Sequence, residues 1–253
     1  MTLSKKKIRS DFNRAAQNYE QFATLQRKVA EKLTKFGWPI FDQNGLVVDV
    51  GCGTGFIKQI LKSANILQID ISEKMCRKAQ EFGQAITGDM ENLPIQFESV
   101  DGIISSLTLQ WANDVDLVFD EFNRVLKKGA PFILSTFGSH TLQELKSIFR
   151  MLDPHVHVNN FFGPEELMEK AHLAGFTNLA VKVDSSIKEY KDVMELMYTM
   201  KHIGANNKSE ARKKTFHGKD YFKKLDSLYR GSFGHSTMLP ATWEVIYLKG
   251  FKE

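Results

Sequence analysis

The sequence LVVDVGCGTG, residues 46–55, decides the fold of this chain. Apolar and β-branched residues lead into Asp49 and then into three glycines separated by single residues. This pattern predicts a buried parallel strand, a tight turn and a helix. Gly51, Gly53 and Gly55 carry no side chain, so their backbone can adopt positive φ and approach a ligand closely. A helix beginning near Phe56 directs its amide groups at such a ligand, and the stretch therefore predicts a nucleotide-type site.

The spacing of the glycines distinguishes between two kinds of nucleotide site. The dinucleotide fingerprint G-x-G-x-x-G needs its third glycine where Phe56 stands, and Gly55 comes one residue early. The pattern therefore argues against NAD. A second predicted strand, Ile66 to Asp70, ends in an acid 19 residues after Gly51. Doubly wound folds place a carboxylate there to bind two ribose hydroxyls, so a ribose-containing ligand remains.

Three motifs, DVGCGTG, QIDIS and GDMENLP, resemble those of the class I S-adenosylmethionine-dependent methyltransferases. The resemblance implies an α/β fold with a Rossmann-like seven-stranded sheet, helices on both faces, and S-adenosyl-L-methionine as cofactor. It places the methionine end on the first motif, the ribose on Asp70, and the adenine on Asp89 and Met90. The cofactor-binding residues implied in this way are Asp49, Gly51, Cys52, Gly53, Gly55, Asp70, Ile71, Met75, Asp89, Met90, Glu91, Ser106 and Leu107.

Length and composition favour one domain. The chain has 253 residues and 42% hydrophobic content, enough for a single α/β core. We expect residues 1–253 to form one methyltransferase domain with four parts: an N-terminal helical lid (1–40), a cofactor-binding core (41–183), a helical basic cap (184–240) and a last strand (241–253). The start of the sequence has no apolar signal region and no stretch has about 18 apolar residues, so we expect a cytoplasmic protein.

The expected elements alternate between strands and helices. Residues 5–37 are expected to be helical, with an apolar stripe of Phe12, Ala15, Ala16, Tyr19, Phe22 and Ala23. Expected strands are 46–50, 66–70, 85–87, 100–105, 131–137, 176–183 and 242–249. Expected helices are 56–63, 72–82 and 114–126, with a further helix between Gly163-Pro164 and Gly175. The segment from Asp184 to Pro240 is expected to be helical.

Positive charge is unevenly distributed over the chain. The net charge is +4, but residues 201–230 hold nine Lys or Arg against three acids, and residues 1–10 add Lys5, Lys6, Lys7 and Arg9. Two interpretations remain open: a solvated helix surface, or a binding surface for an acidic partner. The two cysteines, Cys52 and Cys76, provide neither a metal set nor a disulfide framework.

A narrower resemblance extends over nearly the whole chain. The pattern F-x-R-A-A-x-x-Y from Phe12, LQW at 109–111, STFGSHTLQEL at 135–145, H-x-N-x-F at 157–161 and KHIGANN at 201–207 are similar to the malonyl-acyl-carrier-protein O-methyltransferases of biotin synthesis. This family methylates the free carboxyl of a malonyl thioester. The resemblance implies acyl-carrier protein carrying malonyl-phosphopantetheine, or malonyl-CoA, as partner, with no nucleic acid, membrane or metal. Ser139-His140 departs from the family pattern, which has a glycine there.

This chemistry needs no general base, because the substrate carboxylate is ionised at neutral pH and is already a nucleophile. Catalysis then depends on alignment and exclusion of water, so an apolar pocket with few donors is expected. We expect Tyr19 to be catalytic. The expected substrate-binding residues are Gln110, Trp111, His157 and Lys201, and the expected partner-docking residues are Arg212, Lys213 and Lys214.

Other functions remain open at this stage. Methylation of a free small molecule, such as a quinone precursor or a fatty acid, explains the cofactor motifs but not the basic segment. A non-catalytic cofactor-sensing or RNA-binding protein needs a blocked crevice or aromatic platforms, and no RNA-binding motif is present. Base methylation is disfavoured because Ser106-Leu107-Thr108 replaces the expected Asn or Asp followed by Pro-Pro. His155 and His157 lack a third nearby metal ligand.

Overall fold

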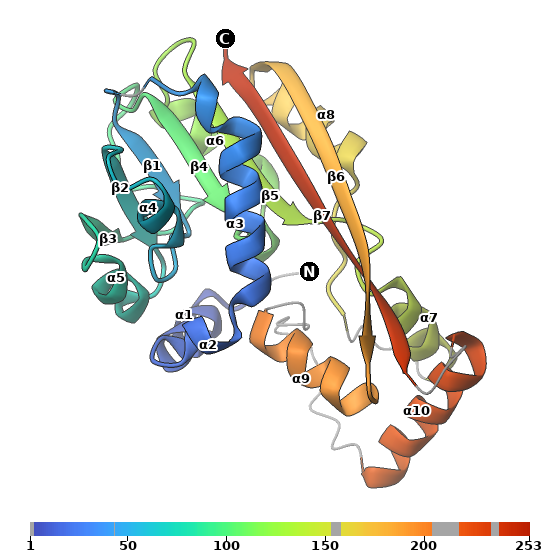
Figure 1. Ribbon diagram of the computed structural model, residues 1–253. Helices are drawn as coiled ribbons and strands as arrows, with labels where there is room; N and C mark the ends of the chain where they lie inside the picture. The colour runs from blue at the N-terminus through green and yellow to red at the C-terminus, as the bar shows by residue number, and fades with distance from the viewer. Residues whose placement is uncertain (1–2, 43, 153–157, 204–217, 234–237) are drawn as a thin grey trace.

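One mixed sheet organises the molecule (Figure 1). A computed structural model describes residues 3–42, 44–152, 158–203, 218–233 and 238–253. Within these residues, seven strands lie in the order β3-β2-β1-β4-β5-β7-β6. Their bounds are β1 (Val47–Val50), β2 (Ile66–Asp70), β3 (Ala85–Thr87), β4 (Gly102–Ser106), β5 (Pro131–Phe137), β6 (Phe176–Tyr190) and β7 (Leu239–Lys252). The first five strands are parallel and β7 is antiparallel to both neighbours, which confirms the predicted fold class.

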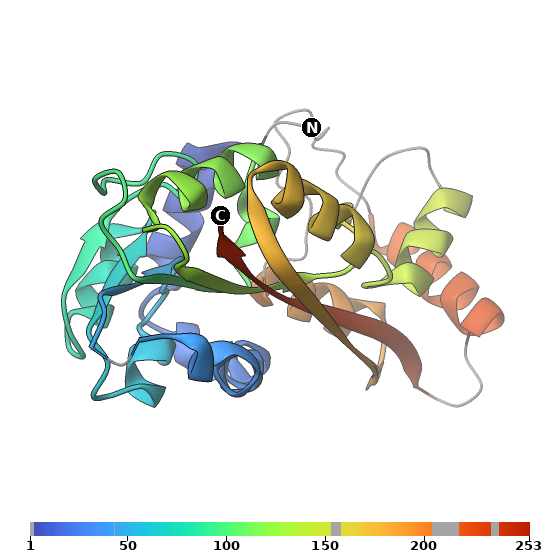
Figure 2. The ribbon, with the colours of Figure 1, turned by 90° about the horizontal axis from the view of Figure 1, so that it is seen from above.

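Helices cover both faces of this sheet, as Figure 2 shows for α3 and α4 on one face and α6 and α8 on the other. The described helices are α1 (Lys5–Ala15), α2 (Tyr19–Phe22), α3 (Thr24–Gly37), α4 (Phe56–Ile60), α5 (Glu73–Ala79), α6 (Val115–Val125), α7 (Gln143–Leu152), α8 (Pro164–Leu173), α9 (Val193–Ile203) and α10 (Lys219–Phe233). Short 3₁₀ turns occupy Trp38–Ile40 and Leu109–Trp111. Helices α4 and α5 are shorter at their C-terminal ends than the sequence predicted.

Alternation along β1 divides the core into two layers. Val47 packs with Leu33 of α3 and Ile57 of α4, whereas Val48 packs with Phe119 of α6 on the opposite face. Because successive side chains of a strand point to opposite faces, Asp49 lies on the same side of the sheet as Val47. This places a carboxyl group beneath the glycine loop, on the side that α3 covers.

The N-terminal region is broken into three helices rather than one, so the expectation for residues 5–37 was too simple. Asn18 (φ −114°, ψ 5°) and Ala23 (φ −86°, ψ 25°) leave helical geometry and separate α1, α2 and α3. The breaks let α1 lie across the sheet edge while α3 packs along its face (Figure 1). Phe22, expected on a continuous apolar stripe, is instead 42% exposed.

The segment after residue 183 begins as a strand, and the prediction of helix from Asp184 was wrong there. β6 continues to Tyr190 because it pairs with β7 from Asp184↔Val245 to Tyr190↔Leu239. β7 is correspondingly longer at both ends than predicted. The strand crosses the predicted boundary between core and cap at residue 184, and the division of the chain into four parts remains a proposal.

The extended β6–β7 hairpin carries a second packed region with α7, α9 and α10. Leu196 of α9, Tyr229 of α10 and Leu145 of α7 are fully buried in one cluster with Trp243 of β7. Trp243 Nε1 donates to the hydroxyl of Tyr190 over 3.0 Å. From here on, the cap means this region, α7, α9, α10 and the β6–β7 hairpin, which is larger than the predicted cap of residues 184–240. It joins the α3 face of the sheet in one continuous core.

Candidate active site

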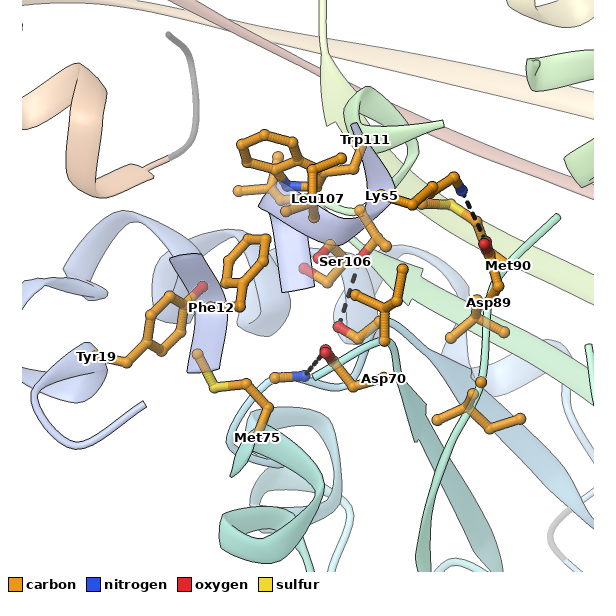
Figure 3. Close-up of a pocket in the computed structure, with 18 residues that line it drawn as sticks. Lys5, Phe12, Tyr19, Asp70, Met75, Asp89, Met90, Ser106, Leu107 and Trp111 are labelled. Carbon is orange, nitrogen blue, oxygen red and sulfur yellow. Dashed lines mark hydrogen bonds and ion pairs between the residues drawn. The ribbon is translucent and has the colours of Figure 1, made fainter. Parts of the chain in front are cut away.

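A cavity lies at the carboxyl edge of the parallel strands, beneath α1 and the start of α2 (Figure 3). Strands β1, β2 and β4 end there, and the loops that follow them form its walls. Of the residues predicted from the sequence, those lining the cavity are Tyr19, Gly51, Gly53, Asp70, Ile71, Met75, Asp89, Met90, Ser106, Leu107 and Trp111. The topology thus brings together residues from five segments of the chain.

Other predicted site residues lie behind the walls or outside the described residues. Asp49, Cys52, Gly55, Glu91 and Gln110 are in contact with lining segments but are not part of the lining. His157, Arg212, Lys213 and Lys214 lie outside the described residues, as does the side chain of Lys201. Their predicted roles stay predictions.

The glycine loop forms the floor of the cavity. Gly51, Gly53 and Gly55 have φ of 79°, 55° and 87°, which side-chain-bearing residues adopt with strain. A Cβ at Gly51 lies only 2.1 Å from Thr108 Oγ1, so this position has no room for a side chain. Gly53 is different, because a Cβ added there would meet only Tyr19 Cε1 among the described residues, at 3.8 Å. Thr108 therefore fills the space beside Gly51, whereas the space beside Gly53, towards Tyr19 of α2, is free of other atoms from the described part of the chain.

Asp70 holds the loop to the end of β2. Its Oδ2 accepts from the amide of Gly53 at 3.0 Å and its Oδ1 accepts from the amide of Ser72 at 2.8 Å. Burial raises the pKa of Asp70 to about 6, although these two hydrogen bonds act to lower it. A carboxylate has about four acceptor positions. Asp70 therefore retains acceptor capacity on the side that faces the cavity.

Asp49 is an ionisable group without a described partner. It is 1% exposed, and within the described residues neither carboxyl oxygen has a hydrogen-bond donor. Burial, and secondarily the charge of Asp70, raise the pKa of Asp49 to about 8. A buried, unpaired carboxyl is costly unless a positive or hydrogen-bond-donating group compensates it. The site fits a cationic ligand that carries several donors, as S-adenosylmethionine does.

The opposite wall is built by Asp89 and Met90 after β3. Asp89 Oδ1 accepts from the amide of Glu91 at 3.1 Å, and Glu91 Oε1 in turn accepts from the amide of Asn113. Lys5 of α1 reaches this wall and forms ion pairs with both carboxylates. Asp89 and Asp70 stand at the ends of neighbouring strands. This arrangement suits a nucleoside whose ribose meets Asp70 and whose base meets Asp89.

Aromatic side chains of α1 and α2 form the roof. Phe12 packs edge-on against Trp111 with ring centroids 5.3 Å apart, and Tyr19 stacks on Phe56 at 6.3 Å. Burial, and then the charge of Asp70, raise the pKa of the Tyr19 hydroxyl. This hydroxyl therefore stays protonated and acts as a neutral donor at physiological pH. Figure 3 shows Tyr19 and Phe12 next to each other at one side of the cavity.

The loop after β4 supplies the remaining wall. Leu107 has a φ of 50°, and its amide donates to the carbonyl of Ser135 in β5 at 2.9 Å. Gln110 Nε2 donates to the Leu107 carbonyl at 2.7 Å and its Oε1 accepts from Thr136 at 3.3 Å. Gln110 thus supports the loop through bonds inside the protein. Its predicted contact with the substrate stays a prediction.

The turn at Ser139-His140 is fixed by β7. The amide of Gly138 donates to the carbonyl of Glu244 at 3.0 Å, and His140 Nδ1 lies 2.9 Å from Glu244 Oε2. Lys146 Nζ donates to the Ser139 carbonyl and lies over the ring of Phe161. The turn therefore needs no glycine at 139 or 140, because Gly138 provides the close approach to Glu244.

Sequence reasoning gave no site role to seven of the residues that line the cavity: Lys5, Ile8, Phe12, Val50, Ile69, Gly88 and Thr108. Lys5 was counted only as part of a basic segment, and no local pattern distinguishes it from Lys6 or Lys7. Thr108 follows the predicted Ser106 and Leu107 by one residue, and the need to fill the space beside Gly51 is visible only in three dimensions.

No described helix has the length and apolar character needed to cross a bilayer. Nor do the described His, Cys, Asp and Glu side chains gather into any group of three that could ligate a metal ion.

Comparison with known proteins identifies the family. Residues 48–134 match a model described as a methyltransferase domain. A malonyl-[acyl-carrier protein] O-methyltransferase from Methylovorus sp. is 33% identical over 99% of this chain and 90% of its own length. A biotin biosynthesis bifunctional protein from Teredinibacter turnerae is 37% identical over 96% of this chain, which spans only 46% of that longer relative.

Solved structures support the fold. A SAM-dependent methyltransferase from Thermotoga maritima superposes with a TM-score of 0.57 and 20% identity, covering 97% of this chain and 99% of its own. The methyltransferase family match, combined with the glycine loop and the unpaired acid beneath it, identifies S-adenosylmethionine as the cofactor. The chain belongs to the malonyl-[acyl-carrier protein] O-methyltransferase family.

Proposed function

We propose that this protein transfers a methyl group to the free carboxyl of a malonyl thioester on acyl-carrier protein, an early step of biotin synthesis. The observation that carries the proposal is a cavity lined by the Tyr19 hydroxyl, by apolar rings and by Asp70, with the buried, unpaired Asp49 behind its glycine loop. When bound, S-adenosylmethionine supplies a methyl group on a positively charged sulfur. The names of the relatives point to the same acceptor.

The residues of this chain would hold the cofactor at three places. Asp49 and the glycine loop would receive its methionine end, Asp70 its ribose, and Asp89 with Met90 its adenine. Buried carboxylates suit these contacts, because charge-assisted hydrogen bonds to ionised acceptors are the stronger kind. Met75 and Ile71 supply apolar surface between the ribose and adenine positions.

Catalysis by this site would consist of positioning. A carboxylate with an ordinary pKa is ionised at neutral pH and needs no base, and the described residues that line the cavity include no histidine. The charges of carboxylate and sulfonium cancel as the methyl group moves, so strong stabilisation of either ion would slow the reaction. Tyr19, with its neutral hydroxyl, can orient the acceptor without adding charge. Phe12 and Trp111 would exclude water above it.

A labelling experiment tests the acceptor. The protein is incubated with methyl-labelled cofactor and, separately, malonyl-loaded carrier, malonyl-CoA, free malonate, a fatty acid and a quinone precursor. We expect base-labile label on the malonyl thioester of the carrier, with slower labelling of malonyl-CoA. Preferential labelling of the fatty acid or quinone precursor would replace this proposal with methylation of a free small molecule.

We also propose that the basic segment 201–230 docks the carrier. Acyl-carrier proteins are acidic, and Arg212, Lys213 and Lys214 could steer the encounter electrostatically. Reversing these three residues to Glu should raise KM for the malonyl-loaded carrier by at least tenfold and leave malonyl-CoA turnover less affected. Added salt should weaken the native enzyme in the same direction.

A matched control uses three exposed lysines near the cofactor half. Reversal of Lys62, Lys74 and Lys78 changes the net charge by the same amount, so it separates local docking from overall charge. Equal losses in the two triple variants would contradict docking by 212–214. An equal loss on carrier and malonyl-CoA would assign those residues to the pocket or to folding.

A further inference from the structure

The four positive residues near the N-terminus occupy different environments. Lys6, Lys7 and Arg9 are exposed on α1, whereas Lys5 turns inward and lines the cavity (Figure 3). Among the described residues that line it, Lys5 is the only cation. A surface for an acidic partner therefore does not account for Lys5, although it could account for the other three.

Lys5 joins α1 to the wall where the adenine is expected. Its Nζ lies 2.8 Å from Asp89 Oδ1 and 3.1 Å from Glu91 Oε1. The three side chains are 23%, 32% and 14% exposed, so the pairs are partly removed from solvent. Partly buried pairs are screened less than pairs at a fully exposed surface. This arrangement forms a substantial link between roof and wall.

The contacts around Asp89 leave one oxygen for a ligand. Oδ1 accepts both from Lys5 Nζ and from the amide of Glu91, which fixes the orientation of the carboxylate. Within the described residues, Oδ2 has no recorded donor. An exocyclic amine has two N–H groups and can donate a hydrogen bond to Oδ2. A keto group at the same position can only accept hydrogen bonds. A fixed carboxylate therefore discriminates between these two bases.

Polar contacts fix α1 at both of its ends, and Lys5 lies at one of them. Beside it, the amide of Leu3 donates to Asn113 Oδ1 at 2.5 Å. At the far end, Asn13 Oδ1 accepts from Ser72 Oγ at 2.7 Å and from the amide of Lys74 at 3.1 Å. The helix thus spans from the adenine wall to the turn after Asp70, and the charged contact lies at the adenine end.

We propose that Lys5 is a positioning residue for the cofactor: it fixes Asp89 as the acceptor for the exocyclic amine of adenine and holds α1 closed over the nucleoside. The proposal rests on the cofactor assignment within the proposed function, and it adds a source of base selectivity on the lid. The identity of the methyl acceptor does not enter it.

Calorimetric binding of two product analogues tests the proposal. S-adenosylhomocysteine carries the 6-amino group, and S-inosylhomocysteine carries a 6-keto group in its place. The native protein should prefer the adenosyl compound by a large factor. Lys5→Met should lower the affinity for the adenosyl compound about tenfold and the affinity for the inosyl compound much less. The ratio of the two affinities should therefore become smaller. Lys5→Arg should restore most of it.

The control variant is Lys6→Met, which removes the same charge from the adjacent, exposed position. It should bind both analogues as the native protein does. In turnover, Lys5→Met should raise KM for the cofactor while kcat at saturation stays within about twofold, a split that a loss of folded protein does not produce. Melting temperature without ligand should change little.

Two results would overturn the proposal. Unchanged binding in Lys5→Met would remove Lys5 from the site, and an equal loss for both analogues would mean that Lys5 only closes the lid without setting the base preference. Because neither analogue needs a methyl acceptor, an error in the proposed substrate leaves these measurements interpretable.

Discussion

The parallel half of the sheet and the β6–β7 cap are built on different principles. In the parallel half, the candidate site residues lie at or near the carboxyl ends of the strands: Asp49 within β1 and the glycines after it, Asp70 as the last residue of β2, and Asp89 after β3. The cap is instead organised by a long antiparallel ladder that runs from Asp184↔Val245 to Tyr190↔Leu239. The cavity lies at the carboxyl edge of the first half, and the cap packs against the α3 face of the sheet.

The two regions also differ in how their polar groups are paired. Burial raises the pKa values of two acids of the parallel half, Asp49 and Asp70. The cap contains satisfied pairs instead, such as Trp243 with Tyr190 and the Tyr229 hydroxyl with the Pro240 carbonyl. We therefore expect changes to the acids of the first half to alter cofactor binding, and changes to the buried contacts of the cap to alter stability.

The largest effect is expected from Asp70→Ala. The variant leaves two ribose hydroxyls without their charged acceptor, so affinity for S-adenosylhomocysteine should fall about a hundredfold or more, corresponding to about 3 kcal/mol. Calorimetry measures this loss. The Gly53 amide also loses its acceptor, so melting temperature serves as a control. Native affinity in this variant would remove Asp70 from the site.

Tyr19→Phe should act on turnover instead of cofactor binding. The ring can still stack on Phe56, but the hydroxyl that orients the acceptor is lost. We expect kcat to fall by about ten- to a hundredfold with cofactor affinity nearly constant. Steady-state kinetics and calorimetry measure the two quantities. A lower melting temperature with native turnover would assign Tyr19 to packing alone.

Acid should weaken cofactor binding in two steps. Asp49 and Asp70 bind best as carboxylates, and their pKa values in the free protein are raised to about 8 and about 6. Affinity should therefore decrease as pH falls below about 8 and more steeply below about 6, by up to tenfold per pH unit for each group. Asp49→Asn should remove the upper step only. Titration calorimetry across pH 5–9 measures both, and a flat profile would contradict the assignment.

The smallest effect is expected in the cap. Tyr190→Phe leaves Trp243 Nε1 buried without its acceptor, which should cost about 1–3 kcal/mol of unfolding free energy and several degrees of melting temperature. Affinity for S-adenosylhomocysteine should remain native. A weakened affinity of similar size to that of Asp70→Ala would break the separation between the two regions.

The parallel half was predictable because its signals are local. Three glycines with positive φ lie within five residues, and Asp70 follows a short apolar strand, so sequence spacing alone places them together. Residues 184–190 carry no such signal: DSSIKEY is mostly polar and exposed, and it becomes a strand only because β7 pairs with it. The breaks at Asn18 and Ala23 likewise follow from how α1 lies over the cavity.

The sequence also could not predict where the charged side chains lie in the fold. Composition identified Lys5 as one of four basic residues, but only the fold shows that its ammonium group meets two carboxylates at the cavity wall. Conversely, the family motifs in residues 135–145 pointed to a specific enzyme without revealing that Glu244 of β7 fixes the Ser139-His140 turn. Long-range partners of this kind have no signature in a single sequence.

The direction of β7 has a practical consequence for handling the protein. Because β7 is antiparallel to β5, Phe251 pairs with Pro131 at the beginning of β5, and Glu253 lies at the edge opposite the cavity (Figure 1). The amide of Leu3, in contrast, donates to Asn113 Oδ1 and so fixes the chain just before α1. An affinity tag, dye or surface tether at Glu253 should leave the roof undisturbed, whereas the same group next to Leu3 would compete with the closing of α1.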